Sequence, residues 1–281
     1  AELWNSFADG GRYALDDGTM SKLKRTRNVE FIERAKQYLE TNHIGYVTRV
    51  DPLFPTGLAQ SEVDPPFALF YKGDPNLLRT DCLAVVGTRN ASQYGKYVTD
   101  KFVEELSERF TIVSGLATGI DGFAHRAALK SGGKTIAVLG SGLFNVSPAS
   151  NIGLFDEICR TGLVFSEYPP DVHGTVYSFP QRNRLVSGIS KGVLVVEAAT
   201  KSGALITAGC AAEQGRDVFG TRRYRQTTFG WYEQSHQARR SRGDRWQRHN
   251  VVLRRDVRKE KTQYRRIEFR RRGHTAYLGG R

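Results

Sequence analysis

The segment between Leu83 and His125 constrains the fold more than any other part of the sequence. It contains two short apolar runs, Leu83–Val86 and Thr111–Val113, and each is followed by a glycine-containing turn and a stretch with helical character. A strand, a tight turn and a helix, repeated twice in succession, are typical of an open α/β sheet. In such sheets ligands bind at the carboxyl ends of the strands, where the next helix presents free N–H groups and a positive dipole end. The segment therefore predicts an anion site, with phosphate as the expected ligand, over two adjacent turns.

The same alternation continues through residues 80–220. Apolar strands are predicted at Leu83–Val86, Thr111–Val113, Thr135–Leu139, Leu163–Phe165 and Val193–Glu197, with a last strand near Val218. Helices are predicted at Tyr94–Arg109, Gly122–Ser131, Ile152–Thr161 and Leu205–Gln214. Short, almost wholly apolar strands are expected where helices cover both faces of a parallel sheet. We therefore predict an α/β fold, with a doubly wound parallel sheet, right-handed crossovers and flanking helices.

We expect four regions along the chain. Residues 1–28 are polar and are predicted to form a poorly ordered leader. Residues 29–79 contain an amphipathic helix and short β-like runs, and they are expected to pack on the core as an extension. Residues 80–220 form the core, and residues 221–281 form a tail. Because the chain begins at Ala1 rather than at a methionine, we expect a fragment or a processed product.

Several functional classes are disfavoured by composition. No apolar run approaches the roughly 20 residues of a membrane span, and no export signal is recognisable, so a cytoplasmic protein without membrane contact is expected. The three cysteines, Cys82, Cys159 and Cys210, share no metal or redox spacing and are expected to be reduced and buried. We therefore predict no metal and no cofactor.

The positive charge is confined to the tail. Residues 221–281 carry 19 Lys/Arg and five Asp/Glu, a net of +14, whereas the whole chain has a net of +13, so residues 1–220 have a net of −1. A basic tail of this kind ordinarily indicates a nonspecific nucleic-acid binder. A nonspecific nucleic-acid binder is the weakest of the three functions that we consider for this chain. Deletion of residues 221–281 tests it.

The glycine turns supply the first candidate ligands. Gly87, Thr88 and Arg89 follow one strand and offer close backbone approach, a hydroxyl and a planar guanidinium, although Arg89 at a plain surface loop is an equally good interpretation. Ser114, Gly115 and Gly119 precede a helix with Asp121 as a possible N-cap. This turn matches neither G-x-G-x-x-G nor G-x-x-x-x-G-K-[ST], so neither a dinucleotide fingerprint nor a triphosphate loop is predicted.

Two further features of the turns have plainer interpretations. Asp121 and His125 lie four residues apart on one helical face, and a structural hydrogen bond between them is favoured over a catalytic pair because no nucleophile is placed beside them. The turn Gly140–Gly142 repeats the strand-end pattern, but an ordinary tight turn explains it equally well.

Polar clusters later in the chain add the remaining candidates. Phe179, Arg182, Asn183 and Arg184 combine an aromatic ring with two guanidinium groups, which suits base stacking and phosphate contact. Because two arginines at i and i+2 do not share a helical face, one is expected to bind ligand and the other to form an internal ion pair. A further anion site is predicted after the Val193–Glu197 strand, at Lys201, Ser202, Gly203 and Thr207.

These residues resemble the DNA-processing protein DprA (Smf) family of natural transformation. The resemblance covers Val63 to Phe219 and rests on D-P-P, V-V-G-T-R, S-G-L-A-T-G-I-D-G-F-A-H, F-P-Q-R-N-R-L-V-S-G, V-L-V-V-E-A and S-G-A-L-I-T-A, in family order. It implies an extended Rossmann fold that binds single-stranded DNA without catalysis, forms a homodimer and loads a RecA-type recombinase. It also implies that Arg89, Phe179 and the Arg182/Arg184 pair are the DNA-binding residues, and that a helical module usual ahead of the core is missing or truncated.

The family pattern stops at Phe219, where V-P-G is expected. Back-translation from Gly220 with permitted codons, read one base later, yields V-P-G-D-I-D, so we interpret residues 221–281 as out of frame and expect disorder there. The alternative function is that of a nucleotide-phosphate hydrolase of the related lysine-decarboxylase-like group. That group carries P-G-G-x-G-T-x-x-E, which this sequence lacks.

Overall fold

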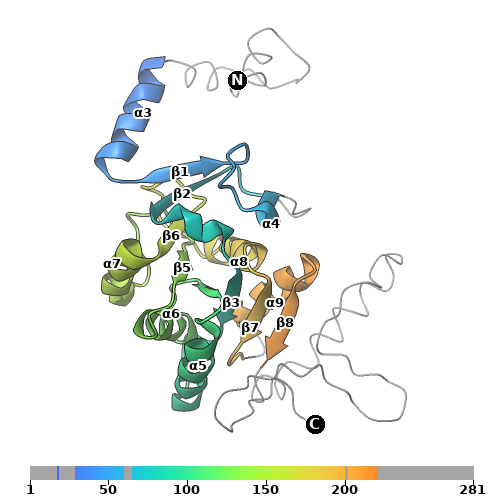
Figure 1. The fold of residues 1–281 in the computed structure, drawn as a ribbon. Helices are drawn as coiled ribbons and strands as arrows, with labels where there is room; N and C mark the ends of the chain where they lie inside the picture. Colours follow the sequence, from blue (N-terminus) through green and yellow to red (C-terminus); the bar gives the residue numbers. More distant parts are fainter. Residues whose placement is uncertain (1–17, 19–28, 60–64, 200–201, 221–281) are drawn as a thin grey trace, which may run out of the picture. The chain divides into compact units, whose positions relative to one another are not determined.

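The computed structural model describes residues 29–59, 65–199 and 202–220, together with Gly18 (Figure 1). The predictions for residues 1–28 and for the tail 221–281 therefore lie almost entirely outside the described residues. The chain divides into two units between Gly45 and Tyr46. The described part of the first unit contains α3 (Val29–Thr41), a helix with no buried residue. It confirms the predicted amphipathic helix and presents exposed apolar side chains, among them Phe31 and Ile32.

One eight-stranded sheet organises the second unit. Its strands follow the order β1-β2-β6-β5-β4-β3-β7-β8. Their bounds are β1 (Gly45–Thr48), β2 (Ala68–Gly73), β3 (Cys82–Val86), β4 (Thr111–Ser114), β5 (Thr135–Val138), β6 (Leu163–Ser166), β7 (Gly192–Val195) and β8 (Asp217–Gly220). The six strands from β6 to β8 pair in parallel, which confirms the predicted parallel sheet. Strand β2 pairs antiparallel with β6, an arrangement that the sequence did not predict.

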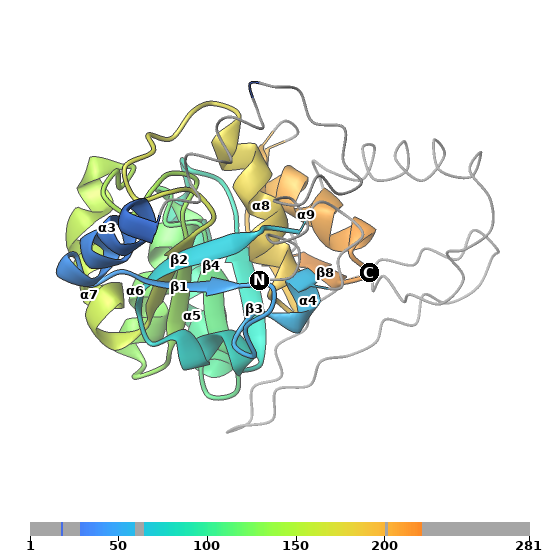
Figure 2. The same ribbon diagram turned by 90° about the horizontal axis from the view of Figure 1, so that it is seen from above.

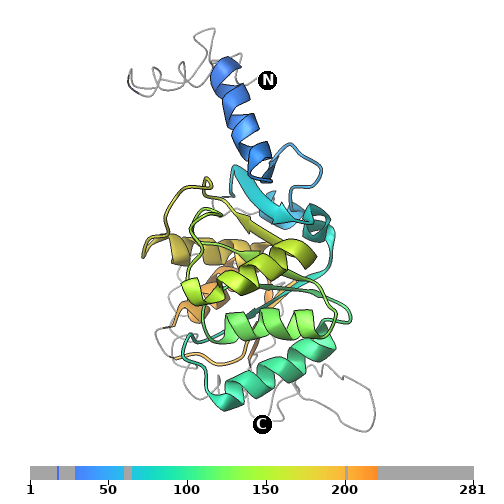
Figure 3. The same cartoon turned by 90° about the vertical axis from the view of Figure 1, so that its left-hand side faces the viewer.

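Helices cover both faces of the sheet. The helices α5 (Gln93–Leu106), α6 (Ile120–Lys130) and α7 (Ile152–Thr161) lie side by side on one face, and α8 (Ser178–Gly188) and α9 (Gly203–Glu213) on the other (Figure 3). Short elements α4 (Thr56–Ala59), η1 (Pro75–Arg79) and η2 (Ala149–Asn151) complete the unit. Successive residues of β3 point to opposite faces, so Leu83 and Val85 join the core under α5 and α6, whereas Ala84 and Val86 join the core under α8 and α9. The apolar stripe predicted on α5 faces the first core, where Val98 and Leu106 are buried.

The order of the strands creates a switch point beside β3. From β3 the chain adds β4, β5 and β6 in one direction, and then returns to add β7 and β8 on the opposite side of β3. Val86 pairs with Val195, and just beyond them the Thr88 amide donates to the Glu197 carbonyl at 2.6 Å. The segments that leave β3 and β7 diverge past this point, and such divergence is where open α/β sheets bind ligands.

Two local predictions were wrong. Helix α8 was missing from the predicted helices. Pro180 is compatible with its first turn, and Arg182 occupies a buried position that hides the apolar periodicity. Asp121 was expected to cap α6, but the N-cap is Gly119, with φ of 75°, and Asp121 lies in the first turn.

Within the described residues, the helices lack the combined length and apolar character that crossing a bilayer demands.

Candidate functional site

A cavity of about 400 Å³ opens at the switch point, where the carboxyl ends of β3, β4 and β7 meet the first turns of α8 and α9. Ten sequence-predicted site residues line it: Gly87, Thr88, Arg89, Gly115, Phe179, Arg182, Asn183, Ser202, Gly203 and Thr207. The lining also includes Asp121 and several small or apolar residues of α8 and α9. The sequence therefore predicted most of one continuous pocket from motifs that lie far apart along the chain.

Arg89 and Phe179 meet at this pocket. The guanidinium carbon of Arg89 lies 5.9 Å from the centroid of the Phe179 ring, within the range of a cation–π contact. Arg89 is exposed, and among the described residues no ion pair or hydrogen bond holds its guanidinium. The ring is bounded elsewhere by backbone, because a Cβ built on Gly140 or Gly174 would lie 2.7 Å or 2.8 Å from a ring carbon. An exposed cation therefore covers a ring that is fixed by its surroundings.

The first turn of α9 is open to the cavity. Ser202 is the N-cap residue, but its hydroxyl makes no capping hydrogen bond, and its Oγ is buried without a partner among the described residues. A Cβ added at Gly203 would meet no atom within 4 Å, so space lies in front of this turn. Free N–H groups, the positive dipole end and an unsatisfied hydroxyl together favour an anion here.

Two other helix starts beside the cavity already hold carboxylates of the protein. A carboxylate oxygen of Glu197 accepts hydrogen bonds from the Ser92 amide at 3.0 Å and the Ser92 hydroxyl at 3.1 Å, directly before α5. Asp121 lies in the first turn of α6, where its carboxylate accepts from the Gly115 amide at 3.1 Å. Because a carboxylate satisfies these positive helix ends, they are less suited to an external phosphate than α9 is. Glu197 was missed as a site residue, although a carboxylate just after an apolar strand could have drawn attention to it.

Arg182 is an internal residue at the floor of the cavity. Its side chain is almost wholly buried, and Nη1 donates to the carbonyl of Gly115 at 2.6 Å and also to the carbonyl of Val138. Burial lowers the pKa of Arg182 to about 10, so it remains charged at neutral pH. Burial also raises the pKa of Asp121, and the nearby charge of Arg182 opposes that shift. The hydrogen bonds of Arg182 to Gly115 and Val138 fix the floor of the cavity, and its charge partly offsets the burial of Asp121.

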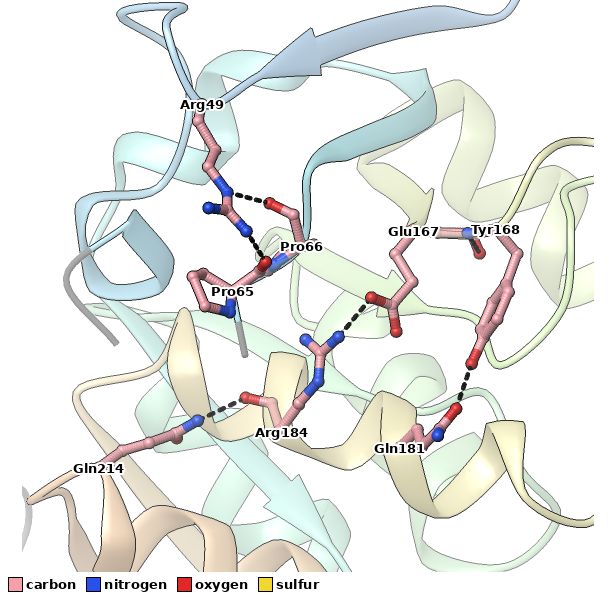
Figure 4. A network of polar contacts seen from close by, with 9 residues as sticks. Arg49, Pro65, Pro66, Glu167, Tyr168, Gln181, Arg184 and Gln214 are labelled. Atoms are coloured by element: carbon pink, nitrogen blue, oxygen red, sulfur yellow. Dashed lines mark hydrogen bonds and ion pairs between the residues drawn. The ribbon is translucent and has the colours of Figure 1, made fainter. Parts of the chain in front are cut away.

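Arg184 points away from the cavity into a separate network. Its guanidinium donates to a carboxylate oxygen of Glu167 at 2.5 Å, and both side chains are largely buried (Figure 4). The Arg184 carbonyl accepts from Gln214 at 2.8 Å, and the Tyr168 hydroxyl donates to Gln181 at 3.0 Å. These contacts tie α8 to the end of β6 and to the segment after α9.

Two other predicted residues, Ser114 and Gly119, lie outside the cavity lining. The Ser114 hydroxyl donates to the Val85 carbonyl at 2.7 Å and is fully buried between strands. Gly119 packs against the backbone of Thr88 and Arg89, where its positive φ is needed. Lys201 lies outside the described residues.

The expected Asp121–His125 hydrogen bond is replaced by other partners. His125 is fully buried, and its Nδ1 lies 2.7 Å from the Thr135 hydroxyl, which itself donates to the Ile112 carbonyl at 2.8 Å. The imidazole must therefore donate from Nδ1, which leaves Nε2 unprotonated. Burial lowers the pKa of His125 to about 3.

In the part of the chain that the structure describes, no cluster of His, Cys, Asp and Glu has metal-binding geometry.

Comparison with known proteins decides the family. Residues 45–243, more than half of the chain, match the model of the family described as DNA recombination-mediator protein A. The chain belongs to this family. The resemblance inferred from the sequence motifs is thereby confirmed.

Curated relatives in the family share close to half of the aligned residues. The chain is 46% identical to protein Smf of Escherichia coli over 190 residues, which are 67% of this chain and 50% of that protein. It is 45% identical to DNA processing protein DprA of Bacillus subtilis over 162 residues, which are 57% and 54% of the two chains. This chain thus spans about half the length of these two relatives.

Solved structures of family members share the fold. DprA of Streptococcus pneumoniae superposes with a TM-score of 0.63 at 39% identity, covering 77% of this chain and 79% of that one. DNA processing protein A of Helicobacter pylori, studied for its single-stranded DNA binding mode, gives a TM-score of 0.60 at 30% identity, covering 69% and 88%. These matches agree with the Rossmann-like sheet described above.

Proposed function

We propose that this protein binds single-stranded DNA in the switch-point cavity and takes part in DNA processing. The observation that carries the proposal is the arrangement of Arg89 over Phe179 beside the open first turn of α9. An aromatic face, a cation and a helix N-terminus are the elements that proteins use to hold a base and its phosphate. Family membership supports the same ligand, since the Helicobacter pylori relative binds single-stranded DNA.

Each group has a defined task in this proposal. A phosphate accepts hydrogen bonds from the first N–H groups of α9 and from the Ser202 hydroxyl. A base stacks on Phe179 and displaces the Arg89 guanidinium, which is free to turn and pair with the backbone. Arg182, held by the carbonyls of Gly115 and Val138, keeps the floor in place without contributing a free charge. Stacking depends on an aromatic face that every base possesses, so binding is expected to tolerate any sequence.

The decisive experiment compares Arg89→Ala with Arg109→Ala in fluorescence anisotropy with a labelled oligothymidylate. Arg109 is an exposed arginine just beyond the opposite end of α5, so it controls for general charge. Loss of Arg89 is expected to weaken binding by about tenfold or more, as expected for a charge-assisted hydrogen bond. The log–log slope of affinity against salt should also become shallower by about 0.7 for each phosphate that the variant no longer neutralises. Equal binding by Arg89→Ala and the wild type would show that the site is wrongly assigned.

A binding role is proposed in preference to nucleotide hydrolysis. The motif of the hydrolase group is absent, and His125, the residue expected to pair with Asp121, is buried and held by Thr135. Incubation with nucleoside monophosphates tests this directly, since measurable phosphate or base release would favour the hydrolase.

The family resemblance also leads us to propose loading of a RecA-type recombinase and formation of a homodimer. Recombinase loading is tested by measuring the rate of RecA filament growth on single-stranded DNA coated with a single-strand-binding protein, with and without the protein described here. Sedimentation equilibrium of the full chain tests the dimer. A monomer that leaves filament growth unchanged would remove both roles and leave DNA binding to be judged by Arg89→Ala.

A further inference from the structure

The segment between β6 and α8 presents unusual apolar exposure next to the cavity. Residues 171–177 are all exposed, and the segment leaves the sheet as a long loop that returns at the start of α8 (Figure 2). Its most exposed large apolar side chains are Val176 and Tyr177, which retain 78% and 77% of their accessible surface. Phe179 of the cavity follows only two residues later. A tyrosine exposed to this extent makes no contribution to the core.

The backbone that carries Tyr177 is held firmly. The Thr175 amide donates to the Ser178 hydroxyl at 2.8 Å, and the Ser178 amide donates back to the Thr175 hydroxyl at 3.1 Å. The Ser178 hydroxyl also lies 2.5 Å from the Gly140 carbonyl, to which it donates. The Tyr177 carbonyl accepts from the Gln181 amide in the first turn of α8. A fixed backbone with an exposed aromatic side chain is the arrangement of a stacking platform, since little backbone entropy is lost when a ligand binds.

The same loop adjoins the ring that lines the cavity. A Cβ on Gly174 would lie 2.8 Å from the Phe179 Cζ, so the loop touches Phe179 before it reaches Tyr177. Among the described residues, no hydrogen bond or ring contact occupies the Tyr177 side chain. Tyr177 is the N-cap residue of α8, and its side chain makes no capping hydrogen bond.

From these contacts we infer that Tyr177 is a second stacking platform, which binds a different base of the strand from the one on Phe179. This inference rests on the proposed function and extends the binding track from the cavity along the N-terminus of α8. The occupant is the same single strand, because the platform is continuous with the cavity through Gly174 and Phe179. Each stacked base is expected to add about fivefold or more to affinity.

An abasic scan tests the inference. Dissociation constants are measured by anisotropy for a mixed-sequence oligonucleotide of about 12 nucleotides, within the range of known single-strand site sizes. One abasic residue is placed at each position in turn. Tyr177→Ala should weaken binding of the intact strand by about fivefold or more. When the abasic residue replaces the base that stacks on Tyr177, Tyr177→Ala should no longer weaken binding. The abasic position at which Phe179→Ala no longer weakens binding should be a different one. Tyr177→Phe should bind as the wild type does, and Tyr177→Leu should resemble Tyr177→Ala.

Matched variants separate the possible failures. Tyr46→Ala removes another exposed tyrosine, on β1, which four strands separate from β3, and it should leave binding unchanged. If Arg89→Ala weakens binding but Tyr177→Ala does not, the second platform is overturned and the proposed function stands. A Tyr177→Ala effect that is equal at every abasic position, or that alters sedimentation mass instead of DNA affinity, also overturns the platform. Normal binding by Arg89→Ala would overturn the proposed function itself.

Discussion

The guanidinium of Arg182 donates to the carbonyl of Gly115 across 2.6 Å and so joins α8 to the end of β4 from within the protein. The same guanidinium lies close enough to Asp121 for its charge to oppose the burial-induced rise in the carboxyl pKa. A residue that the sequence offers as a DNA ligand is thus an internal support for the cavity floor.

Replacing Arg182 with methionine is expected to lower the free energy of unfolding by about 1–3 kcal/mol, because the buried carbonyls of Gly115 and Val138 would lose their donor and Asp121 would lose a nearby favourable charge. Urea denaturation monitored by circular dichroism measures this. The double variant Arg182→Met, Asp121→Asn should recover part of the loss, since a neutral amide needs no counter-charge. An unchanged unfolding midpoint in the single variant would contradict the supporting role.

Removing the Ser202 hydroxyl is expected to separate affinity from stability. Ser202→Ala deletes a buried oxygen that has no partner among the described residues, so the free energy of unfolding should stay equal or rise slightly. Affinity for single-stranded DNA should fall by about two- to tenfold through the loss of one hydrogen bond. The control is Ser190→Ala, because the Ser190 hydroxyl is also buried but donates to the Val186 carbonyl at 2.8 Å. That variant should lose stability and keep its affinity, so the reverse outcome would refute the assignment.

Gly140 is expected to tolerate alanine poorly because it borders Phe179. The new Cβ would lie 2.7 Å from Cδ1 and 3.1 Å from Cα of Phe179, and the second contact cannot be relieved by turning the ring. Gly140→Ala should cost about 1–3 kcal/mol of stability and also weaken DNA binding. Gly153→Ala in α7 serves as the control, since its Cβ meets no atom within 4 Å, and helix propensity favours it by up to about 1 kcal/mol. Equal behaviour of the two variants in thermal unfolding would be evidence against this contact.

His125 is expected to make stability depend on pH. Its pKa is lowered by burial to about 3 in the folded protein, whereas it is about 6.5 when unfolded. Between these values the unfolded chain binds a proton that the folded chain rejects, so stability falls as the pH drops below about 6.5. The loss attributable to His125 should be about 2 kcal/mol at pH 5 relative to pH 8.

The variant His125→Gln removes this titration while retaining a side chain that can donate to Thr135. Denaturation series at several pH values should therefore show a shallower loss of stability toward acid than in the wild type. The two proteins are compared by the slope of the free energy of unfolding against pH, because the variant will have a different stability at neutral pH. Parallel slopes would mean that His125 is not buried as a neutral base.

The sequence predicted the sheet well because its signals are local. Apolar runs such as Leu83–Val86, each followed by a glycine turn, identify strands and their ligand-binding ends without knowledge of distant contacts. Helix α8 escaped prediction because Arg182 stands at a buried position where periodicity requires an apolar residue. A charge in the core depends on its partners, and the partners of Arg182, the carbonyls of Gly115 and Val138, come from other parts of the sheet.

The sequence predicted most residues of the candidate site, but it did not predict which of them bind ligand and which have partners inside the protein. Motifs around Arg89 and Phe179 indicated a nucleic-acid site, and the cavity brings them together. The sequence could not tell which helix starts are already filled, because Glu197 reaches Ser92 only through the assembled sheet. It also predicted one ligand and one internal ion pair for Arg182 and Arg184, whereas the structure gives both guanidinium groups internal partners.

The hydrogen bonds from Ser92 to Glu197 connect residues 105 positions apart. The loop that carries Arg89 is thus held on one side by the start of α6, where the Ile120 amide donates to the Thr88 carbonyl, and on the other by Glu197 beyond β7. Because contacts between residues so far apart in sequence tend to form late in folding, we expect the cavity to be completed late. A DNA strand bound in this cavity would contact elements from both sides of β3, the side of β4 and the side of β7. Its binding energy would therefore add to the global free energy of folding. Binding of the proposed single strand is therefore expected to stabilise the folded protein against unfolding.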